Sequence, residues 1–461
     1  MDRLRTHMFL VATIVVLMVG FYVLLSPPFK ELRTSIGLPA DQPGARYNDT
    51  VGAADIINEA EDNFFLGRIT FVYHSVFITL LYATLLIFSK MYLKNDLKNI
   101  VMDFSLIGTV MVVVSAIIYG YIDRNFFWHG VFIAGLTVFF FIGLLILFNF
   151  KPKTLLDWNI WLAGVLLLIG GIWGAWLGSS FMHHRHEFLE ALINARYNPD
   201  LGEENVYWRA LTSHEHAMIA IALALVFFLG IAVAGIDESK TLFKVLNAKR
   251  IMYITIIGQL FMALASYAVT FFGKIAHLII TPAALSLIFG TLLLSFMAKK
   301  GDVIKWGLII GNVIIWVAVA IPGAITAISL RKPVFFNPNF RDPAWDWAEL
   351  AYNIGHWHIL LATWGIALLI IYLTWPDDLI GSYKVVRYGA WLALIGYSIA
   401  MIGINFYMLA NPPGAYSPNP YDNVWLALIV EPALALMSLG IAISYLAVSY
   451  THLTLPTTER V

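Results

Sequence analysis

The chain has 461 residues, of which 60% are hydrophobic and only 13% are charged. This composition excludes an ordinary soluble globular protein and indicates a polytopic α-helical membrane protein, because apolar runs of about twenty residues recur along the sequence. The formal net charge is zero and cysteine is absent. The lack of cysteine excludes disulfides, thiolate metal sites and covalent c-type haem attachment through Cys-x-x-Cys-His.

Twelve hydrophobic segments follow one another along the chain, each long enough to cross about 30 Å of hydrocarbon. The first follows the charged stretch MDRLRTH and has no small-residue cleavage site, so we expect a retained helix and not a signal peptide. The sequence thus predicts an all-α bundle of twelve transmembrane helices. The predicted spans are 8–26, 69–91, 102–121, 129–149, 158–180, 213–235, 251–272, 277–297, 304–329, 352–375, 386–409 and 423–447.

The loops between these spans differ in charge. One set is rich in Lys and Arg, as in KMYLKNDLK and ESKTLFKVLNAKR, and this side is expected to be cytoplasmic together with the N-terminus. The longer loops of the other side, 27–67, 181–211, 331–351 and 410–422, are where we expect function to concentrate. The expected location is a prokaryotic cytoplasmic membrane.

The end of the chain departs from the pattern before it. The segment SYTHLTLPTTERV resembles translated adapter sequence. We therefore expect one membrane domain over 1–449, and we exclude the tail 450–461 with its His452 from the functional argument.

Histidines gather at the outer ends of four predicted spans. Helical rise places them within about 10 Å of the outer boundary, so they share one layer. Histidine inside a membrane is costly and usually faces a cavity, a partner or a ligand. The members of this layer are His74 on the second span, His214 and His216 on the sixth, His277 on the eighth, and His356 and His358 on the tenth.

The remaining histidines have simpler interpretations. His7 and His129 are expected to be interfacial side chains, and His277 taken alone would be interpreted in the same way. The segment FMHHRHEF, with His183, His184 and His186, is typical of a solvated amphipathic stretch.

The layer suits haem iron, because a low-spin b-type haem needs two axial imidazoles, one on each face of the ring. A haem between two helices would take its ligands from different spans. In a His-x-His pair the two side chains point about 200° apart on a helix, so each member can serve a different centre. His356 and His358 could thus hold two haems.

This arrangement resembles the catalytic subunit of the haem–copper oxidase superfamily, including the large subunits of nitric oxide reductases. The resemblance covers about 8–447 and rests on span order and histidine placement. It implies that His74 and His358 hold a low-spin haem b, and that His356 holds a high-spin, substrate-binding haem b. It also implies that His214 or His216 binds copper or non-haem iron.

The sequence departs from the family at this second metal. The sixth-span motif His-Pro-Glu-Val-Tyr is replaced by SHEHAMI, and the seventh span lacks the adjacent histidine pair. His277 is the possible substitute, which would give a metal set of His214, His216 and His277 with Glu215 as a catalytic carboxylate. Such mixed N/O ligands favour non-haem iron over a three-imidazole copper.

Three functions remain open. The first is a haem-dependent reductase of nitric oxide or oxygen, and the second is a non-catalytic b-haem electron-transfer subunit of a larger complex. The third is a histidine-lined metal or proton transporter. For the first two functions, which involve haem, the expected electron donor is cytochrome c or a haem-containing partner subunit. It is expected to dock on 27–67 and 331–351. The lipid bilayer is the other expected partner, and no nucleic acid is expected.

Overall fold

The computed structural model describes ten stretches of the chain: 3–25, 30–36, 73–122, 126–183, 206–237, 239–299, 302–320, 343–375, 383–409 and 425–454. Helices account for nearly all of them. The α-helices are α1 (Arg3–Leu25), α2 (Lys30–Ser35), α4 (Tyr73–Tyr92), α5 (Asn95–Tyr121), α6 (Phe126–Asn149), α7 (Leu155–His183), α10 (Val206–Ala234), α11 (Ala248–Phe272), α12 (His277–Phe296), α13 (Asp302–Ile315), α16 (Pro343–Thr374), α18 (Lys384–Leu409) and α19 (Glu431–Thr454).

Short elements join or extend these helices. They are the 3₁₀ turn η3 (Gly273–Ala276), the π-helical turns η4 (Trp316–Ala320) and η7 (Trp425–Val430), and the antiparallel strands β1 (Thr241–Leu242) and β2 (Leu246–Asn247).

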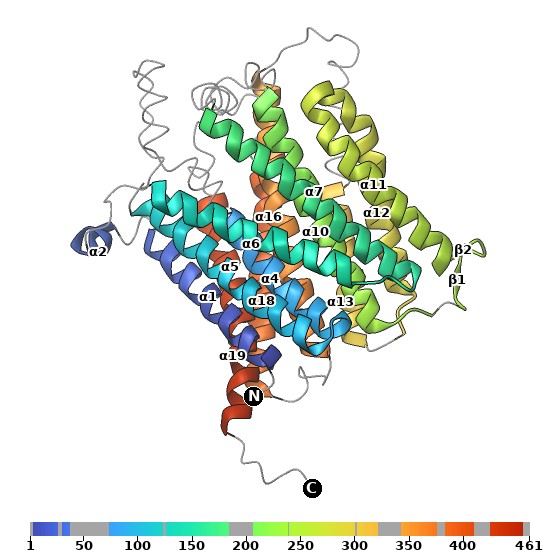
Figure 1. Ribbon diagram of the computed structural model, residues 1–461, viewed down its shortest axis with the longest axis horizontal. Helices are drawn as coiled ribbons and strands as arrows, with labels where there is room; N and C mark the ends of the chain where they lie inside the picture. The colour runs from blue at the N-terminus through green and yellow to red at the C-terminus, as the bar shows by residue number, and fades with distance from the viewer. Residues whose placement is uncertain are drawn as a thin grey trace.

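The all-α membrane bundle predicted from the sequence is confirmed. Within the described residues, eleven helices are long and apolar enough to cross a membrane. The ninth predicted span, 304–329, corresponds to a shorter apolar helix, Val303–Val319, and its remainder after 320 lies outside the described residues. The chain enters the bundle at α1 and leaves it along α19 at the same end (Figure 1).

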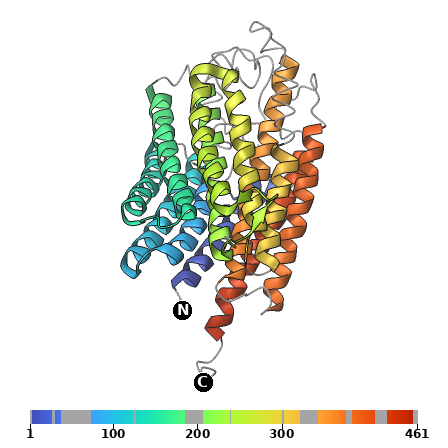
Figure 2. The same cartoon turned by 90° about the vertical axis from the view of Figure 1, so that its right-hand side faces the viewer.

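The helices run alongside one another (Figure 2). Two of them, α10 and α16, are the most buried. In α10, 83% of the most apolar window is buried, and in α16 the share is 78%, against 28% in α6 and in α7. α10 packs against α7, α11 and α16, and α16 packs in addition against α4 and α18. Side chains on α10 and α16 therefore face protein, whereas much of α6 and α7 is left for lipid.

Hydrogen bonds inside the bundle fix how the central helices meet their neighbours. The indole nitrogen of Trp364 on α16 donates to the hydroxyl of Thr84 on α4 over 3.0 Å. The side-chain oxygen of Asn159 on α7 accepts from Thr255 at 2.7 Å and from Gln259 at 2.9 Å, both on α11. A buried amide costs free energy unless it is paired, so these bonds set the register of the helices.

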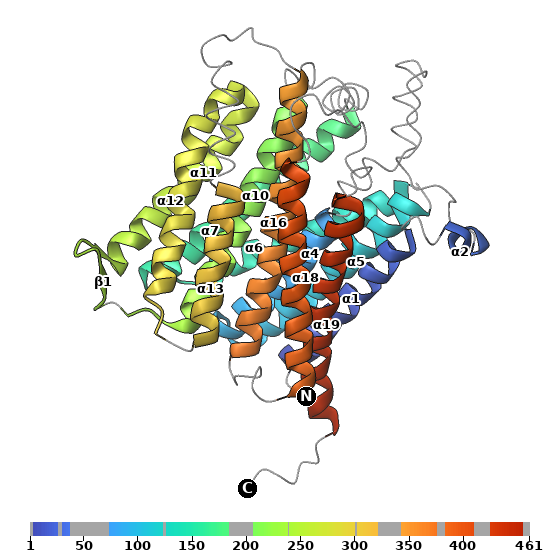
Figure 3. The same cartoon turned by 180° about the vertical axis from the view of Figure 1, so that it is seen from behind.

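The hairpin of α11 and α12 is shaped by its caps (Figure 3). Asn247 begins α11 by accepting a hydrogen bond from the backbone of Arg250 at 2.9 Å, and Gly273 ends it with a left-handed φ of 60°. Glycine adopts that conformation without steric cost. The turn η3 follows at once, so His277 becomes the first residue of α12.

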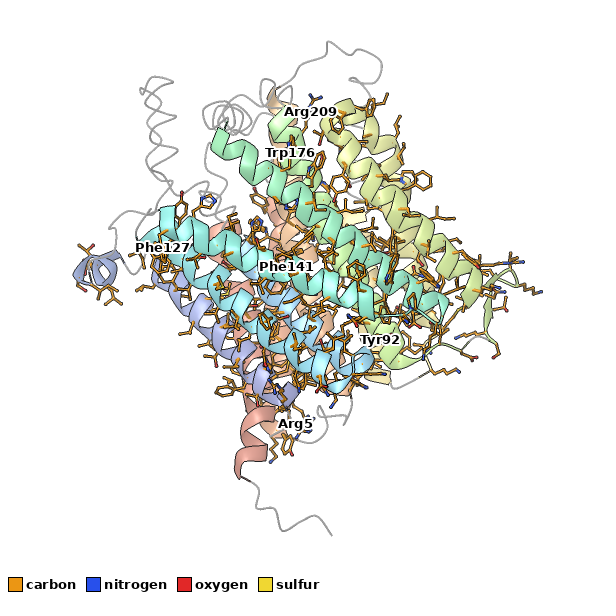
Figure 4. The ribbon with its side chains drawn as sticks, in the orientation of Figure 1. Arg5, Tyr92, Phe127, Phe141, Trp176 and Arg209 are labelled. Atoms are coloured by element: carbon orange, nitrogen blue, oxygen red, sulfur yellow. The ribbon has the colours of Figure 1, made fainter. Side chains whose placement is uncertain are left out.

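The two ends of the bundle differ in chemistry. Exposed lysines lie in the connections α4–α5, α6–α7, β1–β2 and α12–α13, namely Lys94, Lys151, Lys244 and Lys299. We call this the basic end. Figure 4 shows Arg209 of α10 and Trp176 of α7 together at the opposite end, far from Arg5. We call that opposite end the histidine end, because α4 and α12 begin there, beside His74 and at His277.

Candidate functional site: a layer of histidines

The six histidines singled out in the sequence lie at one end of the bundle. α4 and α12 begin within one residue of His74 and at His277. The apolar windows of α10 and α16 begin at Ser213 and Gly355, directly before the two His-x-His pairs. The six histidines therefore lie where α4 and α12 start and where the apolar windows of α10 and α16 begin.

Helix bounds near the layer differ from the prediction in one respect. α10 begins at Val206 and α16 at Pro343, so parts of the expected loops 181–211 and 331–351 are helical. His183 is the last residue of α7. His184 and His186, the rest of the expected amphipathic stretch, lie outside the described residues, as do 37–72 and 410–424.

His74 and His214 form the first pair of the layer. Their ring centroids are 6.3 Å apart and their planes differ by 22°. The ring of Phe132 on α6 meets His74 edge-on at 5.6 Å, so His74 lies between an aromatic wall and the second imidazole. The two histidines come from α4 and α10, which pack against each other.

The surroundings of His214 are built around glycine on α7. A side-chain carbon added at Gly174 would lie 2.7 Å from Cε1 and 3.1 Å from Nε2 of His214, so only glycine leaves room for this ring. The backbone of Gly170, one turn earlier, interacts with the same imidazole. Nδ1 of His214 is buried and has no hydrogen-bond partner among the described residues.

His358 meets a different side chain of α4. The hydroxyl of Tyr73 is hydrogen-bonded to Nδ1 of His358 at 3.3 Å, with the two rings edge to face at 5.9 Å. Trp357, the neighbour of His358, packs edge-on against the same tyrosine at 6.0 Å. Sequence analysis did not single out Tyr73, although a tyrosine directly before His74 was available as a signal.

His216 lies near the two remaining members of the layer, His277 and His356. Its ring centroid lies 6.5 Å from that of His277 on α12, with the planes at 87°. His356 of α16 is within electrostatic range of His216. The two members of the α10 pair therefore turn to different neighbours, as helical geometry predicts for positions two apart.

The expected metal ligands are thus divided. His216 and His277 lie together, whereas His214 packs against His74, and the half-buried Glu215 sits between the pair in sequence. In the described part of the chain, no group of three or more His, Asp or Glu side chains has the spacing of a metal site. Binding by His214, His216, His277 and Glu215 together remains a prediction.

At the histidine end, His129 has aromatic neighbours: its ring lies 5.3 Å from Tyr119 and 6.4 Å from Phe132. It is half-buried near the start of α6. Through Phe132, which also contacts His74, it borders the layer.

His7 differs from the interfacial side chain expected, because it is buried at the basic end with only 4% exposure. Its Nδ1 lies 2.6 Å from the hydroxyl of Tyr82 on α4, and its Nε2 lies 3.2 Å from a carboxylate oxygen of Asp103 on α5. Arg3 forms an ion pair with the same Asp103. These bonds tie α1 to two helices that are remote in sequence, and no local pattern around MDRLRTH indicates them.

Comparison of the chain with protein-family models, with curated proteins and with solved structures gave no match.

Proposed function

We propose that this chain is a membrane haem oxidoreductase that receives electrons at its histidine end and reduces nitric oxide, with oxygen as the alternative substrate. The observation that supports the proposal is the histidine layer itself: six imidazoles from α4, α10, α12 and α16 gather at one end of the bundle, and two of them are 6.3 Å apart. Neutral imidazoles on different helices are the ligands that b haems use.

The residues fit such a group. A buried imidazole nitrogen without a partner, at His214, is unfavourable in a protein core unless a ligand accepts or supplies the missing interaction. Gly174 keeps the space beside that ring free of a side chain. Haem iron held here would supply one-electron chemistry, and the protein would supply axial ligands and an apolar surrounding that excludes water.

Each member of the layer has a proposed task. His74 and His358 would hold a low-spin haem b, as the family resemblance implies. His356 would hold a high-spin haem b, which would supply the iron that binds substrate. His214, His216 and His277, with Glu215, would hold non-haem iron, and Glu215 would pass protons.

The orientation belongs to the same proposal. Lysine-rich short connections favour the cytoplasm, so the basic end and the start of α1 would face inward in a prokaryotic cytoplasmic membrane. The donor, cytochrome c or a haem-containing partner subunit, would then approach the histidine end from outside.

Optical spectroscopy of the purified protein tests the proposal. We expect the reduced-minus-oxidised spectrum to show two b haems, one of which shifts on adding carbon monoxide. Elemental analysis should find little copper. It should find more iron than the haem groups account for. Haem that never binds carbon monoxide would replace this proposal with the electron-transfer subunit, and a preparation without any haem would reject both.

A further inference from the structure

We propose that the hairpin of β1 and β2 is an anchor that binds the anionic phospholipid leaflet bordering the basic end. Its apolar tip, formed by Phe243 and Val245, enters the interface of that leaflet, and the basic residues around the tip bind lipid phosphates. None of these residues belongs to the histidine layer. The inference therefore goes beyond the proposed function and does not depend on it.

The hairpin makes a tight turn from an unusual pair of residues. The backbone nitrogen of Val245 donates to the carbonyl oxygen of Leu242 over 3.2 Å. The two residues between them both have a positive φ, 52° at Phe243 and 59° at Lys244. Two-residue turns of this kind favour Asn-Gly, because the left-handed conformation is unfavourable for most other residues. A bulky apolar residue and a lysine thus occupy the turn against local preference, which points to a use for their side chains.

The strands separate side chains that pack from side chains that do not. Leu242 and Leu246 are partners across the two strands and pack against the main hydrophobic core. Phe243 and Val245 are instead exposed over 75% and 58% of their surface. Exposed apolar side chains at a turn are unfavourable in water and favourable where lipid covers them. The tip therefore suits an apolar surrounding.

The tip also lies at the boundary of the membrane. The apolar window of α11 begins at Ala248, directly after β2. On the same part of α11, Tyr253 and Ile257 are exposed, as expected of a surface that faces lipid. β1 and β2 lie at the rim of the molecule beside this helix, as Figures 1 and 3 show. The hairpin thus reaches sideways along the bilayer surface.

The base of the hairpin is fixed to the next connection of the basic end. The backbone nitrogen of Asp237 donates to the carbonyl oxygen of Met297 at 2.9 Å, and Nζ of Lys240 donates to that of Phe296 at 2.9 Å. Both acceptors lie at the end of α12. The tip is therefore held in its outward position before any lipid binds, which lowers the entropic cost of binding.

The charge around the tip selects the kind of lipid. Segment 239–250 contains no acidic residue. Its basic residues, all exposed, are Lys240, Lys244, Lys249 and Arg250. Arg250 uses one N–H to bind the carbonyl oxygen of Val245 at 2.6 Å, and a guanidinium has five such donors. Clusters of Lys and Arg beside a membrane span are attracted to anionic headgroups, so charge complementarity favours an anionic leaflet as the partner.

Because the chain has no cysteine, a nitroxide label can be placed at a single introduced cysteine. In the full chain in lipid nanodiscs, we expect the label of Val245→Cys to be accessible to oxygen, which concentrates in lipid, and shielded from a water-soluble nickel chelate. The shielding should be stronger with phosphatidylglycerol present than in phosphatidylcholine alone. Lys151→Cys, in the exposed α6–α7 connection, is the control and should remain accessible to the chelate in both lipids.

Three results at position 245 would overturn the proposal. Access of the chelate in both lipids would place the tip in water. Protection from oxygen and chelate alike would mean that protein, such as a second copy of the chain, covers it. Shielding that does not respond to phosphatidylglycerol would mean that the tip inserts without binding anionic headgroups.

Substitution of the aromatic residue tests insertion on the Val245→Cys background. Phe243→Ser should lower the shielding of the label, because it removes the apolar surface that enters the interface. Phe148→Ser is the matched control, since Phe148 is 80% exposed near the basic end of α6 but distant in sequence from the hairpin. It should leave the label unchanged. Equal effects of the two variants would contradict the role of the tip.

Substitution of the lysines tests headgroup binding in the same way. Lys244→Gln combined with Lys249→Gln should remove the response of the label to phosphatidylglycerol. Lys94→Gln combined with Lys151→Gln removes the same charge from two other connections of the basic end and should retain the response. Equal loss in both double variants would mean that general charge attracts the lipid and that the hairpin has no special part in it.

Discussion

Two regions form where helices pack, but by opposite means: the contact between α18 and α19, and the histidine layer between α4, α10, α12 and α16. A carbon added at Gly396 would lie 2.5 Å from the backbone nitrogen of Met437, and one at Gly389 would lie 2.8 Å from the carbonyl oxygen of Gly440. Figure 3 shows these two helices side by side. Small residues allow such close approach, which drives helix association in lipid.

The histidine layer is packed with large polar side chains and not with small residues. Large polar rings fill it, and at least one buried nitrogen, Nδ1 of His214, has no partner in the described residues. An apolar side chain of similar size would be a better core residue. A sequence that keeps local features against stability usually keeps them for function. The close-packed contact thus favours helix association, whereas the composition of the layer supports the proposed binding site.

The largest expected effect on activity comes from the layer. Replacing His356 with Ala removes the only proposed ligand of the substrate-binding haem, so nitric oxide reduction and the carbon monoxide shift should both be lost. The low-spin signal should persist, because it depends on other histidines. Turnover with a reduced donor and the optical spectrum measure the two. Full turnover in this variant would remove His356 from the site.

The largest expected effect on stability comes from the close-packed contact. Gly440→Ala sets a methyl group against the backbone nitrogen of Ala393, where no flexible side chain can yield. Overpacking of this kind costs about 1–3 kcal/mol, which exceeds the gain of up to about 1 kcal/mol from replacing a helical glycine. Thermal unfolding followed by tryptophan fluorescence should show a lower midpoint.

Gly130→Ala is the control for that measurement, because no atom lies within 4 Å of the added carbon. It should leave the midpoint unchanged or raise it slightly. Equal midpoints for the two variants would mean that the α18–α19 contact is looser than the structure shows.

A smaller effect is expected at the basic end. Tyr82→Phe removes the hydroxyl 2.6 Å from His7 and leaves that buried nitrogen without its tyrosine partner. Loss of one such bond costs about 1 kcal/mol. Arg3→Gln is the comparison, since the Arg3–Asp103 ion pair is solvent-exposed and should contribute less than about 1 kcal/mol. If Arg3→Gln lost more stability than Tyr82→Phe, the exposed ion pair would be the main stabilising contact at this end.

The smallest effect lies outside both regions, in the connection after α10. Hydrogen bonds from Ser239 lower the pKa of Asp237, and Lys299 and Lys240 act in the same direction. A carboxyl group whose pKa is lowered on folding stabilises the protein above its unfolded value of about 4 and loses that contribution as the pH falls through the folded value. As the pH falls from neutral to strongly acidic, the thermal unfolding midpoint of wild type should therefore fall slightly more than that of Asp237→Asn. If the midpoints of the two proteins changed by the same amount across that range, Asp237 would make no pH-dependent contribution to stability.

Hydrophobic runs and charge placement were enough to predict the class and most of the span positions. Predicted 251–272 corresponds to α11 at Ala248–Phe272, and predicted 129–149 to α6 at Phe126–Asn149. α10 and α16 start earlier than hydropathy predicts, because their first turns are polar and a hydropathy pattern marks only the apolar part of a helix.

The sequence by itself determined the membrane bundle and the divergence of His214 from His216, because length, hydropathy and helical geometry are local properties. Only the tertiary structure decided which histidines are neighbours: His74 with His214, His216 with His277, and His358 with Tyr73. It also decided that His7 is a buried partner of Tyr82 and not an interfacial side chain. Such pairings depend on which helices pack and on how each is rotated about its axis. The packing and rotation of the helices are set by contacts between residues remote in sequence, such as Gly174 against His214. No local sequence pattern indicates these contacts.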